Sequence, residues 1–116
     1  MSDRLQVVGI GLATLDVLLR HTEMPTWTHG TTIRAFRLDG GGLVGTAMVA
    51  AAKLGARTGF VGTAGTDEAA ELKLRSMVDC GVDLTRLIRR AGPEDQLVLV
   101  HVHAEPAAVT AMFLPT

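Results

Sequence analysis

Residues 40–61 have the sequence GGGLVGTAMVAAAKLGARTGFV, and this stretch decides the fold. Three glycines form a flexible turn, and the alanine-rich segment Leu43–Leu54 then favours a helix that Gly55 ends. Small side chains let this helix lie close against a sheet, and Ala56–Val61 has the pattern of a core strand. The stretch therefore predicts a glycine-rich loop, a helix and a returning strand, which is the repeating unit of an α/β sheet.

The neighbouring segments extend this unit. Leu5–Ile10 is short, apolar and β-branched, which is typical of a strand buried on both faces of a parallel sheet. Either Thr66 or Asp67 can cap a second helix, which runs to about Cys80 and is ended by Gly81. Two helices, each bracketed by apolar strands, predict a parallel sheet with right-handed crossovers.

After the second predicted helix, the chain favours strands with no helix between them. Their β-branched and apolar runs are bounded by turns that contain glycine and proline. They predict an antiparallel flap attached to the α/β core. These strand segments are Thr85–Arg89, Leu97–Val102 and Val109–Leu114. Before the first helix, Val17–Leu19 is expected to extend the first strand into a loop, and Thr31–Leu38 to form a partly exposed strand.

Composition narrows the class of protein. A length of 116 residues fits one domain, and a hydrophobic content of 47% supplies enough apolar material for a buried core. Eleven basic and twelve acidic residues give a formal net charge of -1, which argues against a general nucleic-acid binder. The chain has one cysteine and no apolar run near the roughly 18 residues that cross a bilayer. We therefore expect a cytoplasmic protein with neither a nucleic-acid nor a membrane partner.

Two features could bind a ligand. Gly40–Gly42 leads into a helix N-terminus, where backbone amides can hold an anion or hydroxyl oxygens; a tight turn is the alternative explanation. Asp16 follows the first strand, at the edge where open α/β sheets bind ligands. Its carboxylate can accept two hydrogen bonds from sugar hydroxyls, or it can serve as a cap or as an ion-pair partner of Arg34 or Arg37.

Other patterns are weaker. His101 and His103 lie on one side of an expected strand with Glu105 nearby, but exposed sheet histidines are more frequent than such metal sites. Residues 9–14, GIGLAT, lack the third glycine of a dinucleotide-binding fingerprint. Cys80 is more typical of a small core residue than of a nucleophile. The sequence therefore assigns no metal ligand and no catalytic residue within this chain.

The order of these motifs resembles the PfkB/ribokinase family of carbohydrate kinases. The matching pieces are VVGIGLATLDV at residues 7–17, the loop with Pro25 and Gly30, residues 40–67, and DCGVDLTRL at residues 79–87. The resemblance covers nearly the whole chain but only the N-terminal portion of a family member.

For the fold, the resemblance implies an α/β, ribokinase-like parallel sheet flanked by helices, with an antiparallel β lid, in truncated form. Residues 1–116 would be the N-terminal part of that domain, with lid strands at about residues 14–38 and 85–115. Lids in this family often pack subunits together, so a homodimer is expected.

For function, the resemblance implies transfer of the γ-phosphate of ATP, with Mg²⁺, to a sugar or sugar-phosphate hydroxyl. This portion would bind the substrate, while the family's catalytic aspartate and its ATP site have no counterpart among the 116 residues. The chain alone is therefore expected to be inactive, and a non-catalytic sugar-binding or dimerisation module is the alternative. The substrate-binding residues that the resemblance implies are Thr14, Asp16, Gly40, Gly41, Gly42 and Gly45.

One departure concerns the substrate. The family's helix usually carries an asparagine where this chain has Gly45, and the sequence contains no asparagine at all. A glycine-rich segment without that asparagine is similar to the branch that contains sulfofructose kinase. The resemblance therefore implies a substrate other than ribose.

Overall fold

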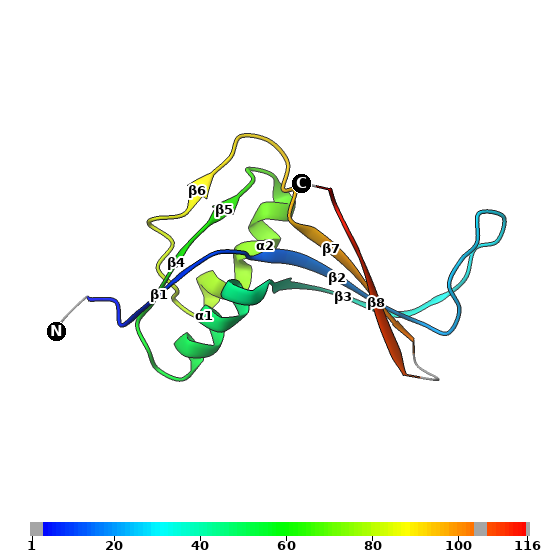
Figure 1. Cartoon of the computed structure of the whole chain (residues 1–116), viewed down its shortest axis with the longest axis horizontal. Coiled ribbons are helices and arrows are strands. Elements are labelled where there is room, and N and C mark those ends of the chain that lie inside the picture. Colours follow the sequence, from blue (N-terminus) through cyan, green and yellow to red (C-terminus); the bar gives the residue numbers. More distant parts are fainter. Residues whose placement is uncertain (1–3, 104–106, 116) are drawn as a thin grey trace.

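The molecule is elongated, with two helices at one end and a long β-sheet projecting from them (Figure 1). The computed structural model describes residues 4–103 and 107–115, and its extents are 58 × 32 × 18 Å. In chain order the elements are β1 (Val7–Ile10), β2 (Thr14–His21), β3 (Ile33–Gly41), α1 (Leu43–Lys53), β4 (Thr58–Val61), β5 (Thr63–Ala64), α2 (Glu68–Asp79), β6 (Ile88–Arg89), β7 (Leu97–His103) and β8 (Ala108–Phe113).

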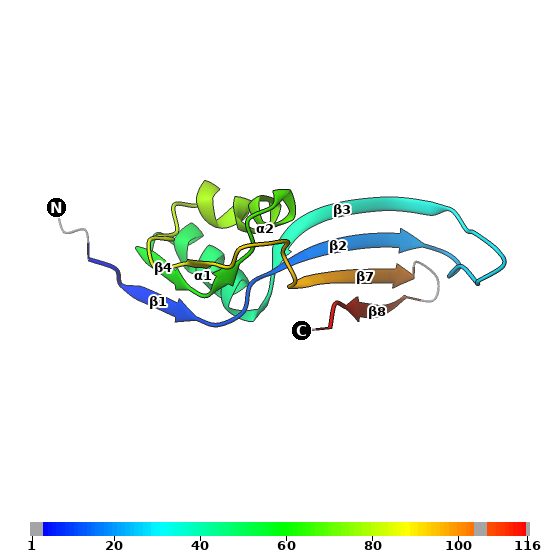
Figure 2. The ribbon, with the colours of Figure 1, turned by 90° about the horizontal axis from the view of Figure 1, so that it is seen from above.

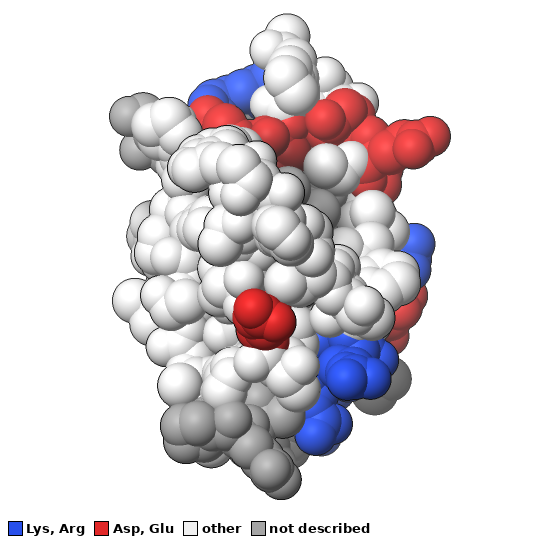
Figure 3. All heavy atoms as spheres, turned by 90° about the vertical axis from the view of Figure 1, so that its right-hand side faces the viewer, with Lys and Arg blue, Asp and Glu red and all other residues white. Residues whose placement is uncertain are grey.

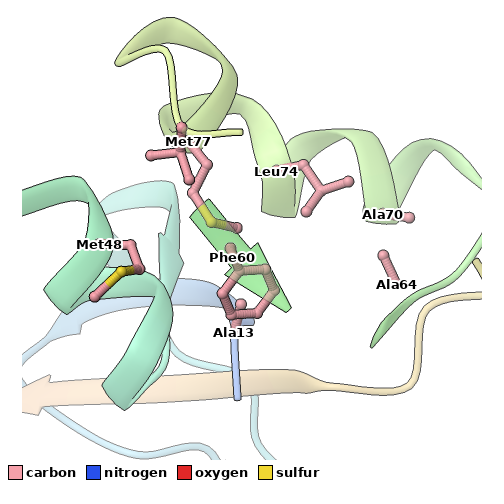
Figure 4. Close-up of a cluster of buried hydrophobic side chains, with 8 residues drawn as sticks. Ala13, Met48, Phe60, Ala64, Ala70, Leu74 and Met77 are labelled. Carbon is pink, nitrogen blue, oxygen red and sulfur yellow. The ribbon is translucent and has the colours of Figure 1, made fainter. Parts of the chain in front are cut away.

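The α/β unit consists of the two helices and the short strands beside them. Strands β1 and β4 pair in parallel, as do β5 and β6, and α1 packs against β1 and β4. Phe60 of β4 lies between Met48 of α1 and Met77 of α2 (Figure 4). This cluster is the hydrophobic core, and it comprises Ala13, Met48, Phe60, Ala64, Ala70, Leu74, Met77 and Val82.

Both predicted helices are confirmed, and local chemistry explains their ends. Asp67, rather than Thr66, caps α2, because its Oδ1 accepts a hydrogen bond from the backbone N–H of Ala70 at 3.1 Å. Gly55 and Gly81 follow the two helices with φ angles of 99° and 76°, a conformation that glycine adopts without strain.

The projecting sheet, which we call the lid, has the strand order β3-β2-β7-β8 (Figure 2). Its outer pairs, β2 with β3 and β7 with β8, are antiparallel, whereas its central pair, β2 with β7, is parallel. The lid is thus a mixed sheet and not the purely antiparallel flap that the sequence predicted. The reason is connectivity: both helices and strands β4, β5 and β6 lie between β2 and β7 in the chain, as a parallel crossover requires.

Side chains alternate between the two faces of the lid. Asp16, Leu18 and Arg20 share one face of β2, which we call the Asp16 face. Val17 and Leu19 of β2 point to the other side, which we call the opposite face. The register of the three strand pairs places each paired residue of the lid strands on one of these two faces.

Three details differ from the predictions. The first strand is not buried on both faces: Val8 and Ile10 are 50% and 75% exposed, because β4 is the only described strand that pairs with β1. Gly40 and Gly41 belong to β3, so only Gly42 forms the turn. The strand expected in the lid at Thr85–Arg89 is reduced to β6, which pairs with β5 of the α/β unit and not with a lid strand.

Among the described residues, neither helix has the length and apolar character needed to cross a membrane.

Candidate functional site

An open pocket of about 510 Å³ lies where the base of the lid meets the N-terminus of α1. It contains three of the six predicted substrate-binding residues, Thr14, Asp16 and Gly42. The carboxylate at the start of β2 and the glycine before α1 therefore share one cavity. The other lining residues are Leu12, Leu43, Thr46, Val98, Val100, Ala111 and Phe113.

Local contacts hold the Asp16 carboxylate in place. The hydroxyl of Thr14 donates a hydrogen bond to Asp16 Oδ1 at 2.6 Å. A Cβ at Gly41 would collide with Asp16 Oδ2, so glycine at this position makes room for the carboxylate. Arg37 lies 3.9 Å from Asp39, and no arginine in the described part of the chain pairs with Asp16. The ion-pair role that the sequence left open for Asp16 is therefore not observed.

The entrance to α1 is less open to an anion than the sequence suggested. Gly42 has a φ of 88°, and a Cβ there would lie 2.7 Å from the carbonyl oxygen of Leu12. That same oxygen accepts hydrogen bonds from the backbone N–H groups of Val44 and Gly45, both at 3.1 Å. Two first-turn amides are therefore already satisfied within the protein, which leaves the backbone at Gly42 and Leu43 to line the pocket.

The other three predicted residues, Gly40, Gly41 and Gly45, line a second cavity of about 180 Å³ behind β3. A Cβ at Gly40 would lie 2.9 Å from the Lys73 carbonyl oxygen, so its glycine lets α2 approach the sheet. The structure thus divides the six predicted residues between two neighbouring cavities. The remaining lining residues of the second cavity are Asp39, Thr46, Val49, Lys73, Ser76 and Met77.

Thr46 is the residue that sequence reasoning missed, because it lines both cavities. It lies in the first turn of α1, four residues after Gly42, and helical spacing places both on one side of the helix. By contrast, a Cβ at Gly45 would lie 3.0 Å from the Cβ of Ala13, so that position faces the core. Thr46, and not position 45, is therefore the residue in the first turn of α1 that brings a polar side chain to the lining of the pocket.

A buried ion pair supports the base of the lid. Lys73 Nζ lies 3.0 Å from Glu94 Oε1, and both side chains are fully buried. The same ammonium donates to the Thr63 carbonyl at 2.9 Å and to Gln96 Oε1 at 2.7 Å. Since Gln96 immediately precedes β7 and its carbonyl accepts from the N–H of Leu15, the pair connects α2 to the lid strands.

Burial and hydrogen bonding act on both charges. Burial lowers the pKa of Lys73 below its ordinary value, although Glu94 partly offsets this. Burial alone would raise the pKa of Glu94, but its carboxylate accepts from the N–H groups of Gln96 and Gly65 and from Lys73. Together these donors hold the pKa of Glu94 below its ordinary value, so the Glu94 carboxylate is charged near neutral pH.

The histidines of the lid form a pair and not the exposed set that the sequence favoured. His101 is buried, and its Nδ1 lies 3.1 Å from Nε2 of His21 on β2. His103 Nε2 donates to the Thr22 carbonyl at 2.6 Å, and Glu105 lies outside the described residues. Within residues 4–103 and 107–115, no three His, Cys, Asp or Glu residues are grouped so that they could hold a metal ion.

The fold is shared with solved kinases. The ribokinase of Arabidopsis thaliana, determined with ribose and ATP, has a TM-score of 0.81 and 22% identity over 93% of this chain and 35% of its own. The fructokinase of Xylella fastidiosa has a TM-score of 0.68 and 25% identity, over 90% of this chain and 32% of its own. A nucleoside kinase of Methanocaldococcus jannaschii has a TM-score of 0.72 and 16% identity, over 91% of this chain and 36% of its own.

These similarities show that the chain has a ribokinase-like α/β fold. The chain spans about a third of the length of these solved kinases. Residues 4–115 also match a family described as pfkB family carbohydrate kinase. That match extends over almost every residue, from before β1 to the end of the lid, and includes the pocket at Asp16. The chain therefore belongs to the pfkB family of carbohydrate kinases.

Proposed function

We propose that this chain is the N-terminal, substrate-binding portion of an ATP-dependent sugar kinase. The observation that carries the proposal is that Thr14, Asp16 and the glycine entrance of α1 line one pocket between the lid and the α/β unit. A pocket with one carboxylate, hydroxyl groups and apolar walls suits a carbohydrate, which has many hydroxyl donors and weakly polar C–H faces.

Each group has a definite task in this proposal. Asp16 Oδ2 accepts hydrogen bonds from sugar hydroxyls, while Oδ1 is oriented by the hydroxyl of Thr14. Thr46 offers a hydroxyl that can either donate or accept. Val98 and Phe113 pack against the carbon atoms of the sugar and exclude water from its polar contacts. A preference for a sugar other than ribose remains part of the proposal.

The described residues supply no group of ligands that we assign to Mg²⁺ or to ATP. No group of three potential metal ligands is present among them, and the amides of Val44 and Gly45 already bond to the Leu12 carbonyl. In this proposal the 116 residues carry out no step of phosphoryl transfer themselves. In the proposed function, the nucleotide, its metal and the catalytic base belong to further parts of a complete kinase, and the 116 residues alone bind sugar without turnover.

Replacement of Asp16 by Asn tests the substrate site. Calorimetry with a panel of pentoses and hexoses should show binding that the Asp16→Asn variant weakens at least tenfold, because an amide is a weaker acceptor than a carboxylate. Asp79→Asn makes the same chemical change at an exposed position of α2 and should bind normally. Equal sugar affinity in the wild type and the Asp16→Asn variant would remove Asp16 from the site.

The alternative, a non-catalytic sugar-binding or dimerisation module, uses the same pocket and lid. The two functions separate when ADP formation is measured for the complete polypeptide that carries this chain. If ADP release depends on the sugar and is slower in the Asp16→Asn variant, the result supports the kinase function. Sugar binding without ADP release would support the module.

We also propose that the lid packs against a second copy of the chain. Its opposite face is apolar and exposed, with Phe36 at 69%, and the Asp16 face must stay accessible to the sugar. Figure 3, viewed from the lid end, shows a surface that is mostly uncharged, with an isolated acidic group within it and basic groups at its edge. Light scattering should give a dimer that Phe36→Glu dissociates.

A cytoplasmic location likewise remains a proposal, based on the single, unpaired Cys80.

A further inference from the structure

We infer that the carbohydrate bound by this chain carries an anionic group, a phosphate or a carboxylate, and that Arg20 and Arg37 of the lid bind it. This inference rests on the proposed function, since it extends the pocket at Asp16 along the same face of the sheet.

Strand register places the arginines on that face. Across β2 and β3, Asp16 pairs with Asp39, Leu18 with Arg37, and Arg20 with Ala35. Alternate residues of paired strands point the same way, so Asp16, Arg20 and Arg37 all lie on the Asp16 face. This face changes from acidic near α1 to basic farther along the lid, which matches a ligand with hydroxyls at one end and an anion at the other.

A hollow lies beside these arginines. It has a volume of about 340 Å³, and both guanidinium-bearing residues line it. Its floor and walls are otherwise apolar or small, so an anion there would meet the arginines as its charged partners. The remaining lining residues are Leu18, Ala35 and Val102, which share the Asp16 face, and Leu19 and Phe36, which alternate with them along the strands.

The spacing suits a single ligand. Arg37 is one strand across from Leu18 and two residues along from Asp16, so the Cα atoms of Arg37 and Asp16 are about 8 Å apart. Arg20 is four residues along β2 from Asp16, or about 13 Å, and is again about 8 Å from Arg37. Long arginine side chains can converge from these positions on a group attached to a sugar held at Asp16.

The two arginines have little ion pairing with the described part of the chain. Within the described part of the chain Arg20 forms no salt bridge, and Arg37 has only a contact of 3.9 Å with Asp39. The side chain of Arg37 is 77% exposed. When a lid covers its substrate, these cations leave water, and burying them without an anion would be costly. A phosphate or carboxylate on the substrate removes that cost and suits the planar geometry of arginine.

The experiment compares matched neutral and anionic sugars on the full chain by calorimetry. The probes are fructose against fructose 6-phosphate, glucose against glucose 6-phosphate, and glucuronate as the carboxylate counterpart of glucose. We expect at least one anionic sugar to bind tenfold or more tightly than its neutral partner, with a preference that falls as salt is raised. The phosphate and glucuronate arms show which anion is used.

Arg20→Gln and Arg37→Gln should each reduce this preference several-fold and leave the affinity for the neutral sugar unchanged. Arg75→Gln, the same change on an exposed position of α2, is the matched control. Circular dichroism should give the wild-type spectrum for all three variants, because all three positions are exposed.

The two proposals fail in different ways. If neutral and anionic sugars bind equally, and Asp16→Asn weakens both, the anionic group is refuted and the proposed function stands. If the preference survives in both arginine variants, Arg20 and Arg37 are not its source and the inference is overturned. If no sugar binds, or if binding is insensitive to Asp16→Asn, the proposed function fails and this inference fails with it.

Discussion

The α/β unit and the lid use apolar residues in different ways. In the α/β unit, Phe60 is 1% exposed, and Leu74 and Met77 are buried beside it. In the lid, Phe36 is 69% exposed, and Phe113 and Val109 are exposed as well, although the strands are longer and the backbone pairing is more extensive. The α/β unit buries its apolar side chains in its own core, whereas the lid leaves many of its apolar side chains exposed.

This difference indicates where the stability of the molecule originates. A sheet with little apolar burial of its own depends on its attachment, and the lid is attached at its base. There Leu15 and Val98 are buried, and Lys73 reaches Gln96 just before β7. In the proposed function the lid covers a substrate on one face and packs against a second copy on the other, while the α/β unit holds the base of the lid in position.

Two phenylalanine truncations test the comparison directly and give the largest expected difference. Phe60→Ala should lower the free energy of unfolding by about 3–5 kcal/mol, because it opens a cavity in the core. Phe36→Ala should change it by no more than about 0.5 kcal/mol when measured on the monomer. Urea unfolding at low protein concentration measures both. Similar losses in the two variants would show that the lid contributes its own core.

Removal of Lys73 should have the next largest effect. Lys73→Met leaves the buried Glu94 carboxylate without its cation, which costs about 3–5 kcal/mol for pairs of this kind. The double variant Lys73→Met with Glu94→Gln removes the uncompensated charge and should recover part of that loss. Hydrogen exchange should quicken in β7 before it quickens in α1. A double variant less stable than Lys73→Met alone would contradict this account of the pair.

How much the sequence could predict depends on the range of the interactions. The helices were predictable to within about two residues, because Gly55, Gly81 and Asp67 act locally. The parallel pairing of β2 with β7 was not predictable, since its partners are about eighty residues apart and no local pattern specifies their direction.

The site shows the same division. Asp16 and Thr14 were identified from their place after the first strand and from the resemblance to a family, and the structure brings them together. Lys73 was missed because a lysine within a helix favours the surface unless a distant partner compensates its burial, and Glu94 is 21 residues away. Gly40 was predicted to admit a ligand, yet α2 occupies the space that its missing side chain leaves.

Acid should loosen the attachment of the lid by a smaller amount than loss of Lys73. The pKa of Glu94 is lowered in the folded chain, so its stabilising contribution is complete above the ordinary pKa that it has in the unfolded chain and is lost as the pH falls through the folded value. Thermal unfolding between neutral pH and pH 3 should show this decline, and Glu94→Gln should flatten it. An equally steep decline in Glu94→Gln would assign the acid sensitivity to other carboxyls.

The smallest predicted effect concerns Asp67, which bonds to both regions. Its Oδ1 accepts from the N–H of Ala70 in α2 and from the N–H of Glu94 before β7, each at 3.1 Å. Asp67→Ala should cost about 1 kcal/mol, and Asp67→Asn should cost less because its amide oxygen still accepts. Hydrogen exchange resolved by residue should quicken at both Ala70 and Glu94 in Asp67→Ala. Faster exchange at Ala70 alone would mean that the Lys73–Glu94 ion pair holds the segment before β7 in place without help from the cap of α2. The boundary between the two regions would then lie at that ion pair.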